Sequence, residues 1–146
     1  MATDFELALF EQQLFEVLEL PAAHRWTLER DTSVPLGVFV VMHPRSHPEE
    51  LFKARLRWTD LLKPPSLKFI DMAMGVETSS AAWPRCFGFR PSSLDACLPW
   101  TAEGHALHPE WAGSAANAYP RVGAPVQFAL LNVQASLDNT YAGRGP

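Results

Sequence analysis

Residues 51–69, LFKARLRWTDLLKPPSLKF, contain the most regular pattern of the chain. Apolar and basic side chains alternate over 51–58, with Phe52, Ala54, Leu56 and Trp58 set against Lys53, Arg55 and Arg57. Because successive side chains of a strand point to opposite faces, the alternation predicts a strand with one buried face. Pro64 and Pro65 mark a loop, after which SLKFIDM (66–72) is predicted as the next strand. The short connection predicts that the two strands pair antiparallel.

Two further strands are predicted before this pair. RWTLERD (25–31) alternates apolar and polar residues around Trp26 and Leu28. LGVFVVMH (36–43) is a continuous apolar run rich in β-branched residues, which is typical of a central strand. No helical segment separates the four predicted strands, so we expect an antiparallel meander without parallel crossovers.

Helices are predicted on both sides of the strands. Residues 3–19 repeat apolar side chains at helical spacing, and Thr3 with Glu6 matches a capping box. The apolar positions of this helix are Leu7, Phe10, Leu14, Val17 and Leu18, widened by Phe5 and Leu9. A second helix is predicted over 125–141, PVQFALLNVQASLDNTY, because it opens with proline and keeps one apolar face. We expect the tail AGRGP (142–146) to be flexible.

These elements predict a single α+β domain over residues 1–146. The chain is 47% hydrophobic and 19% charged, which is typical of a globular protein. The net charge of −4 and the scattered arginines and lysines argue against a nucleic-acid binder. No apolar run approaches the roughly 20 residues needed to cross a bilayer, and the N-terminus lacks the basic region of a signal peptide. We therefore expect a cytoplasmic protein that does not bind a membrane.

The candidate site lies in the long irregular stretch over 73–125, which contains Cys86 and Cys97. Loops of this length inside compact domains are uncommon and usually functional. Aromatic residues surround Cys86 in RCFGF, which predicts a buried thiol. Cys97, the candidate nucleophile, lies in a loop next to small and acidic residues, which suits a thiolate that reaches solvent, and a buried structural thiol is the alternative. His105 and His108 follow Cys97, and an imidazole can deprotonate a thiol or an amine near neutral pH. The sequence does not choose between these histidines, and each is equally consistent with a structural bond to a loop carbonyl.

Two other patterns in the sequence suggest further roles. Cys86, Cys97, His105 and His108 could supply four zinc ligands, but no two cysteines lie two to four residues apart, so the zinc pattern is weak. Asp138 and Asn139 end the second predicted helix, where they could face the active site or cap the helix.

The chain resembles ubiquitin-conjugating enzymes, the UBC fold. The order of helix, four-stranded meander, irregular segment and helix is similar to that fold, as are the Pro64–Pro65 pair and the aromatic Phe69. LDACLPW (94–100) resembles the active-site segment of the family, and Trp111 is similar to the tryptophan that follows the cysteine. The stretch CLPWTAEGHALHPEW (97–111) is similar to bacterial relatives in ubiquitin-like conjugation operons, including the antiphage Bil type.

The resemblance implies an activity and its partners. Cys97 would accept a ubiquitin-like protein as a thioester from an activating enzyme and pass it to an amine on a target protein. His105 or His108 would assist, loop donors near 98–108 would stabilise the oxyanion, and no metal or organic cofactor is needed. Phe5, Leu9 and Phe10 of the first helix would help to dock the activating enzyme. The alternatives are a catalytically silent module that binds one of these partners, and a cysteine hydrolase.

The sequence departs from the family in three ways. The gap between Pro65 and Cys97 is longer than in eukaryotic members, which implies an insertion near 73–86. The His-Pro-Asn motif is absent, and Phe87, Gly88 and Phe89 stand in its expected place. The sequence given ends after the second predicted helix, so the last two helices of the family are missing from it.

Overall fold

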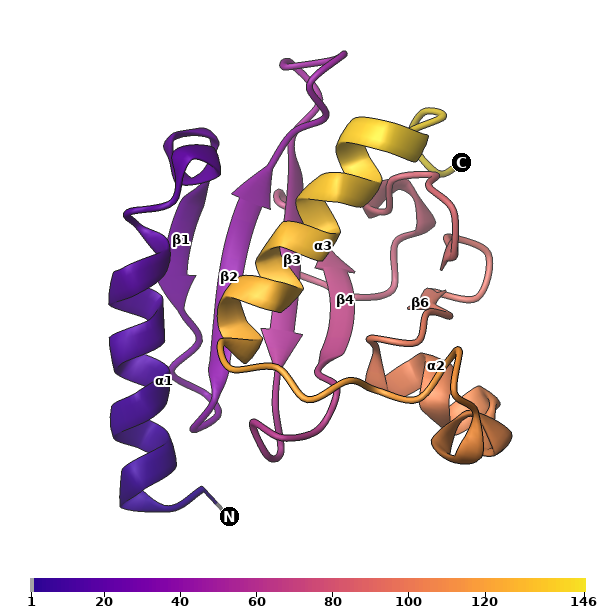
Figure 1. Ribbon diagram of the computed structural model, residues 1–146. Coiled ribbons are helices and arrows are strands. Elements are labelled where there is room, and N and C mark those ends of the chain that lie inside the picture. The colour runs from indigo at the N-terminus through magenta and orange to yellow at the C-terminus, as the bar shows by residue number, and fades with distance from the viewer. Residues whose placement is uncertain (1) are drawn as a thin grey trace.

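The computed structural model describes residues 2–146 and shows an α+β arrangement (Figure 1). Four strands pair antiparallel in the order β1-β2-β3-β4. Their bounds are β1 Thr27–Arg30, β2 Gly37–Met42, β3 Phe52–Arg57 and β4 Ser66–Ile70. The predicted meander is therefore confirmed, and β2, the apolar run, lies inside the sheet as expected.

The alternation along β3 correctly predicts its buried face. Phe52, Ala54 and Leu56 are almost fully buried, and they lie opposite Met42, Val40 and Val38 of β2. The other face departs from the simple pattern at Arg55, which is also buried. Its guanidinium bonds to Glu77 and Ser66, and these partners explain why a charged side chain can be covered there.

Two long helices flank the sheet. Helix α3 (Pro125–Thr140) crosses one face of the sheet, and α1 (Asp4–Val17) lies along the side of β1 (Figure 1). The capping box is present, because Glu6 N–H donates to Thr3 Oγ1 and Thr3 N–H donates to Glu6 Oε2, both at 3.1 Å. Only part of the predicted apolar stripe of α1 is buried, since Phe10 and Val17 are covered whereas Leu18 is 57% exposed.

The stretch over 73–125 contains short elements that the sequence analysis did not predict. They are η2 (Ser80–Ala82), β5 (Phe89–Arg90), β6 (Asp95–Ala96), α2 (Ala102–Leu107) and η3 (Pro109–Gly113), in addition to η1 (Pro21–Arg25) before β1. Strands β5 and β6 form a separate two-stranded sheet that packs beside β4.

The prediction of a flexible tail is wrong. Ala142 N–H donates to Arg85 O and Gly145 N–H donates to Trp83 O, both at 2.8 Å. Arg144 bonds to the carbonyl oxygens of Ala81 and Leu51. The tail is thus held by backbone contacts with residues far away in the sequence, which no local pattern indicates. No helix within residues 2–146 has the length and apolar character that a membrane span requires.

Asp138 ties the C-terminal end of α3 to the rest of the fold. Its carboxylate accepts bonds from Arg25 at 2.8 and 2.9 Å, from Arg45 N–H at 2.9 Å and from Gln134 at 2.9 Å. Burial alone would raise the pKa of Asp138, but the bonds from Arg25 and Arg45 outweigh it and hold the pKa below its usual value. The carboxylate therefore has a structural role. The alternative prediction, in which Asp138 faces the active site, does not fit these bonds.

Replacing Asp138 with asparagine tests this account. A carboxyl group with a lowered folded-state pKa contributes stability above its ordinary pKa, and that contribution is lost as pH falls through the folded value. We expect D138N to reduce the free energy of unfolding by roughly 1–3 kcal/mol at pH 7. The difference in the free energy of unfolding between D138N and the wild type should shrink as the pH falls below about 4. Thermal unfolding of both proteins at pH 7 and pH 3 measures this difference. An equal difference at the two pH values would contradict the structural role of the Asp138 carboxylate.

Candidate active site

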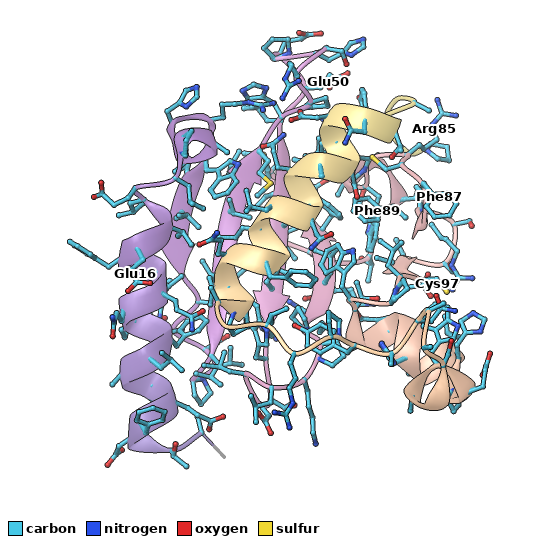
Figure 2. The ribbon with its side chains drawn as sticks, viewed as in Figure 1. Glu16, Glu50, Arg85, Phe87, Phe89 and Cys97 are labelled. Atoms are coloured by element: carbon cyan, nitrogen blue, oxygen red, sulfur yellow. The ribbon has the colours of Figure 1, made fainter. Side chains whose placement is uncertain are left out.

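The ribbon formed by β5 and β6 carries the candidate nucleophile. Phe89 pairs with Ala96 and Arg90 pairs with Asp95. Phe89 and Ala96 are buried, and the Phe89 ring packs against Phe69 of β4 at a centroid distance of 5.5 Å. Cys97 directly follows β6, and Figure 2 shows it on the side of the molecule opposite α1. The buried face of the β5–β6 ribbon therefore holds β6, the strand directly before Cys97, against the core.

Thr101 anchors the backbone on both sides of Cys97. Its buried hydroxyl donates to Ala96 O at 2.6 Å, and its backbone N–H donates to Leu98 O at 3.0 Å. The same hydroxyl accepts from Gly104 N–H at 3.1 Å and so caps α2. Cys97 N–H donates to Gly88 O at 2.8 Å. The sequence analysis missed Thr101, although a threonine three residues before Gly104 at the start of a short helix is a capping signal.

Two glycines allow the chain to close around Leu98. Gly88 has a φ of +80°, and a Cβ there would lie 2.4 Å from the Leu98 side chain. A Cβ on Gly104 would lie 2.2 Å from the carbonyl oxygen of Leu98. Because Leu98 immediately follows Cys97, these close contacts limit where the thiol can move.

The two cysteines differ in environment. Cys86 is 8% exposed, and burial raises the pKa of its thiol to about 12 against a smaller opposing effect of a hydrogen bond with Thr140. A thiol with that pKa is protonated at neutral pH and is a poor nucleophile. Cys97 is free and only partly buried. The predicted burial of Cys86 is confirmed, and Cys97 is the more exposed of the two thiols.

Both candidate histidines lie in the segment after Cys97 and are already engaged. His105 Nε2 is 2.7 Å from Pro99 O, so this nitrogen must donate and Nδ1 carries no proton in the neutral ring. His108 stacks on Trp111 at a centroid distance of 4.4 Å, and its Nδ1 lies 3.0 Å from Glu110. Of the two, His105 is the one bonded to the loop that holds Cys97. Its bond to a loop carbonyl also agrees with the alternative prediction, in which the histidine has only a structural role.

The backbone donors around Cys97 are largely occupied. Their N–H groups donate within the protein at Cys97, Leu98, Thr101, Ala102, Gly104 and His105, with the Leu98 bond the longest at 3.4 Å. Pro99 has no N–H. Within 98–108, Trp100 N–H donates to no acceptor among the described residues, whereas the occupied donors would have to exchange existing bonds. A side-chain donor is a second candidate.

The four proposed zinc ligands do not form a metal site. Cys86 contacts Thr140 at the end of α3, whereas His105 and His108 lie in and just after α2. No group of three or more His, Cys, Asp or Glu side chains in residues 2–146 is arranged to hold a metal ion.

The site thus consists of a partly accessible thiol on a firmly held loop beside the edge strand β4. The histidine that bonds to this loop, His105, lies within α2. No protein family model, curated protein or solved structure matches the chain.

Gly104→Ala tests the tight contact with Leu98. Alanine favours a helix by about 1 kcal/mol over glycine, so propensity alone predicts stabilisation. The clash with the Leu98 carbonyl should outweigh this stabilisation, so that G104A lowers the free energy of unfolding by about 1–3 kcal/mol. Gly113→Ala is the matched control, because a Cβ there meets no atom within 4 Å. A chemical denaturation curve that shows G104A to be as stable as G113A would contradict the close packing.

Proposed function

We propose that this chain is a conjugating enzyme for a ubiquitin-like protein, with Cys97 as the acceptor of the modifier. The observation that supports it best is the contrast between the accessible Cys97 and the buried Cys86. The helix, meander, irregular segment and helix agree with the order expected for such enzymes. The bacterial resemblance of residues 97–111 suggests a role in antiphage conjugation in the cytoplasm.

The proposed reaction has two acyl transfers. In the first, the Cys97 thiolate attacks the thioester between an activating enzyme and the modifier, the new C–S bond forms, and the thiolate of the activating enzyme leaves. In the second, an amine of a target attacks the Cys97 thioester, a C–N bond forms, and the Cys97 thiolate leaves while the amine loses a proton. Neither step requires a metal or an organic cofactor in this chain.

The outer face of α1 is the proposed docking surface for the activating enzyme. Phe5 and Phe15 are 75% and 71% exposed, which is unusual for large apolar side chains. Leu9 is half-buried, whereas Phe10 is completely buried against Trp58. The expectation that Phe10 helps to dock a partner is therefore wrong, because it belongs to the core.

Phe5→Ala tests this surface. We expect slower transfer from the activating enzyme to Cys97 with an unchanged unfolding temperature, because Phe5 loses no core contact. Leu62→Ala is the control, since Leu62 is 82% exposed but lies between β3 and β4. Equal rates of thioester formation for F5A and L62A would argue against docking through Phe5.

A catalytically silent binding module is the alternative. The absent His-Pro-Asn motif favours it, as does the engagement of His105 and His108 in other contacts. Such a module would bind the modifier or the activating enzyme and form no covalent adduct.

The decisive experiment mixes this protein with an activating enzyme, a ubiquitin-like protein and ATP, and separates the products on gels with and without reductant. We expect a reductant-sensitive adduct in the wild type and in C86A. C97A should form none, and C97S should form none or a reductant-resistant oxyester. A full-strength thioester in C97S would exclude Cys97 as the acceptor. A stable complex without an adduct would favour the silent module, and modifier released without transfer would favour a hydrolase.

A further inference from the structure

Arg90 and Asp95 form a rigid ion pair across the β5–β6 ribbon. Arg90 Nε and Nη2 donate to the two carboxylate oxygens of Asp95, both at 2.7 Å. Ser93 Oγ adds a third bond to Asp95 at 3.1 Å. The hydrogen bond from Arg90 is the main cause that lowers the pKa of Asp95, so its carboxylate stays ionised at neutral pH. A two-bonded fork of this kind fixes the plane of the guanidinium.

This pair stands beside the candidate nucleophile. Asp95 precedes Cys97 by two positions, and Ala96 between them is completely buried, so the strand directs Asp95 away from the core. Arg90 is the cross-strand partner of Asp95. The pKa of Arg90 is raised mainly by its bond to Asp95. Arg90 and Cys97 are diagonal neighbours across the ribbon, since Phe89 pairs with Ala96 and Cys97 N–H donates to Gly88 O.

Arg90 also has a donor to spare. The Arg90 side chain is 44% exposed, and no acceptor for its Nη1 is present among the described residues. The backbone N–H groups of Cys97, Leu98 and Thr101 already donate elsewhere. An arginine remains cationic at every physiological pH, so this donor carries a permanent positive charge.

We infer that Arg90, oriented by Asp95, stabilises the negative charge on the Cys97 sulfur. The inference rests on the proposed function, and it identifies Arg90 as the side chain that stabilises the negative charge at this site. In the first transfer the charge is on the attacking thiolate, and in the second it returns to the sulfur as the C–S bond breaks. Arg90 forms and breaks no bond in either step. Asp95 is a positioning residue that acts through Arg90.

Alkylation of Cys97 by iodoacetamide tests the inference without any partner protein. The thiolate displaces iodide from the reagent, so the rate follows the thiolate population. At pH 7 and low salt we expect R90Q to react about threefold to tenfold more slowly than the wild type. R90K should react at an intermediate rate, because it keeps the charge but loses the fork. Mass spectrometry of the Cys97 peptide gives the rate, and the buried Cys86 should stay unmodified.

The control separates a local charge effect from loss of any arginine. Arg45 also pairs with a carboxylate, Asp138, at 3.3 Å, and R45Q should react as fast as the wild type. Added salt should slow the wild type towards R90Q and leave R90Q nearly unchanged, because salt screens an exposed charge. A merely structural role of Arg90 would not produce that convergence. If R90Q lowers the unfolding temperature, R90K provides the second variant, since it keeps the positive charge and should lose less of the alkylation rate than R90Q.

The outcomes separate this inference from the proposed function. Equal alkylation of R90Q, R45Q and wild type would overturn the role of Arg90, even if Cys97 forms an adduct with the modifier. Slower alkylation of R90Q with salt-dependent convergence supports it, even if no modifier adduct forms and the proposed function fails. If both tests succeed, R90Q should also form and discharge its modifier thioester more slowly than R45Q.

Discussion

The packing of three aromatic rings joins the sheet to the segment that carries Cys97. The Trp83 ring lies 5.0 Å from Phe69 of β4, and the Phe89 ring lies 5.5 Å from Phe69 and 6.4 Å from Trp83. Burial of such rings contributes a large apolar area and a preferred edge-to-face geometry. The cluster is the apolar contact that holds the β5–β6 ribbon beside the sheet, and the bonds from Lys68 to Leu94 O and from Ala102 N–H to Pro65 O add to it.

The fold was largely predictable because its signals are local. The alternation over 51–58 and the apolar run over 36–43 each identify a strand from side-chain period alone. The buried Arg55 escaped prediction because its partners, Glu77 and Ser66, are separate in the sequence. The short helix α2 was missed because six residues give too little period to detect. The docked tail was missed because backbone contacts with a distant segment leave no sequence pattern.

The site was predictable only in part, because several of its contacts join residues that are far apart in the sequence. Residue type and the aromatic neighbours of Cys86 were enough to separate the two thiols, and burial accounts for the difference in their chemistry. The histidines could not be ranked from sequence, since their roles depend on Pro99 and Trp111 as partners. Arg90 carries no motif, and its place beside Cys97 follows only from the pairing of β5 with β6.

The role proposed for Cys97 is to carry the acyl group of a ubiquitin-like protein. The most direct measurement is peptide mapping of the purified adduct under acidic, non-reducing conditions that preserve a thioester. The account predicts that the C-terminal fragment of the modifier is joined to the peptide containing Cys97 and that brief treatment with hydroxylamine releases it. Attachment to the Cys86 peptide, or to a lysine through a bond that resists hydroxylamine, would contradict the account.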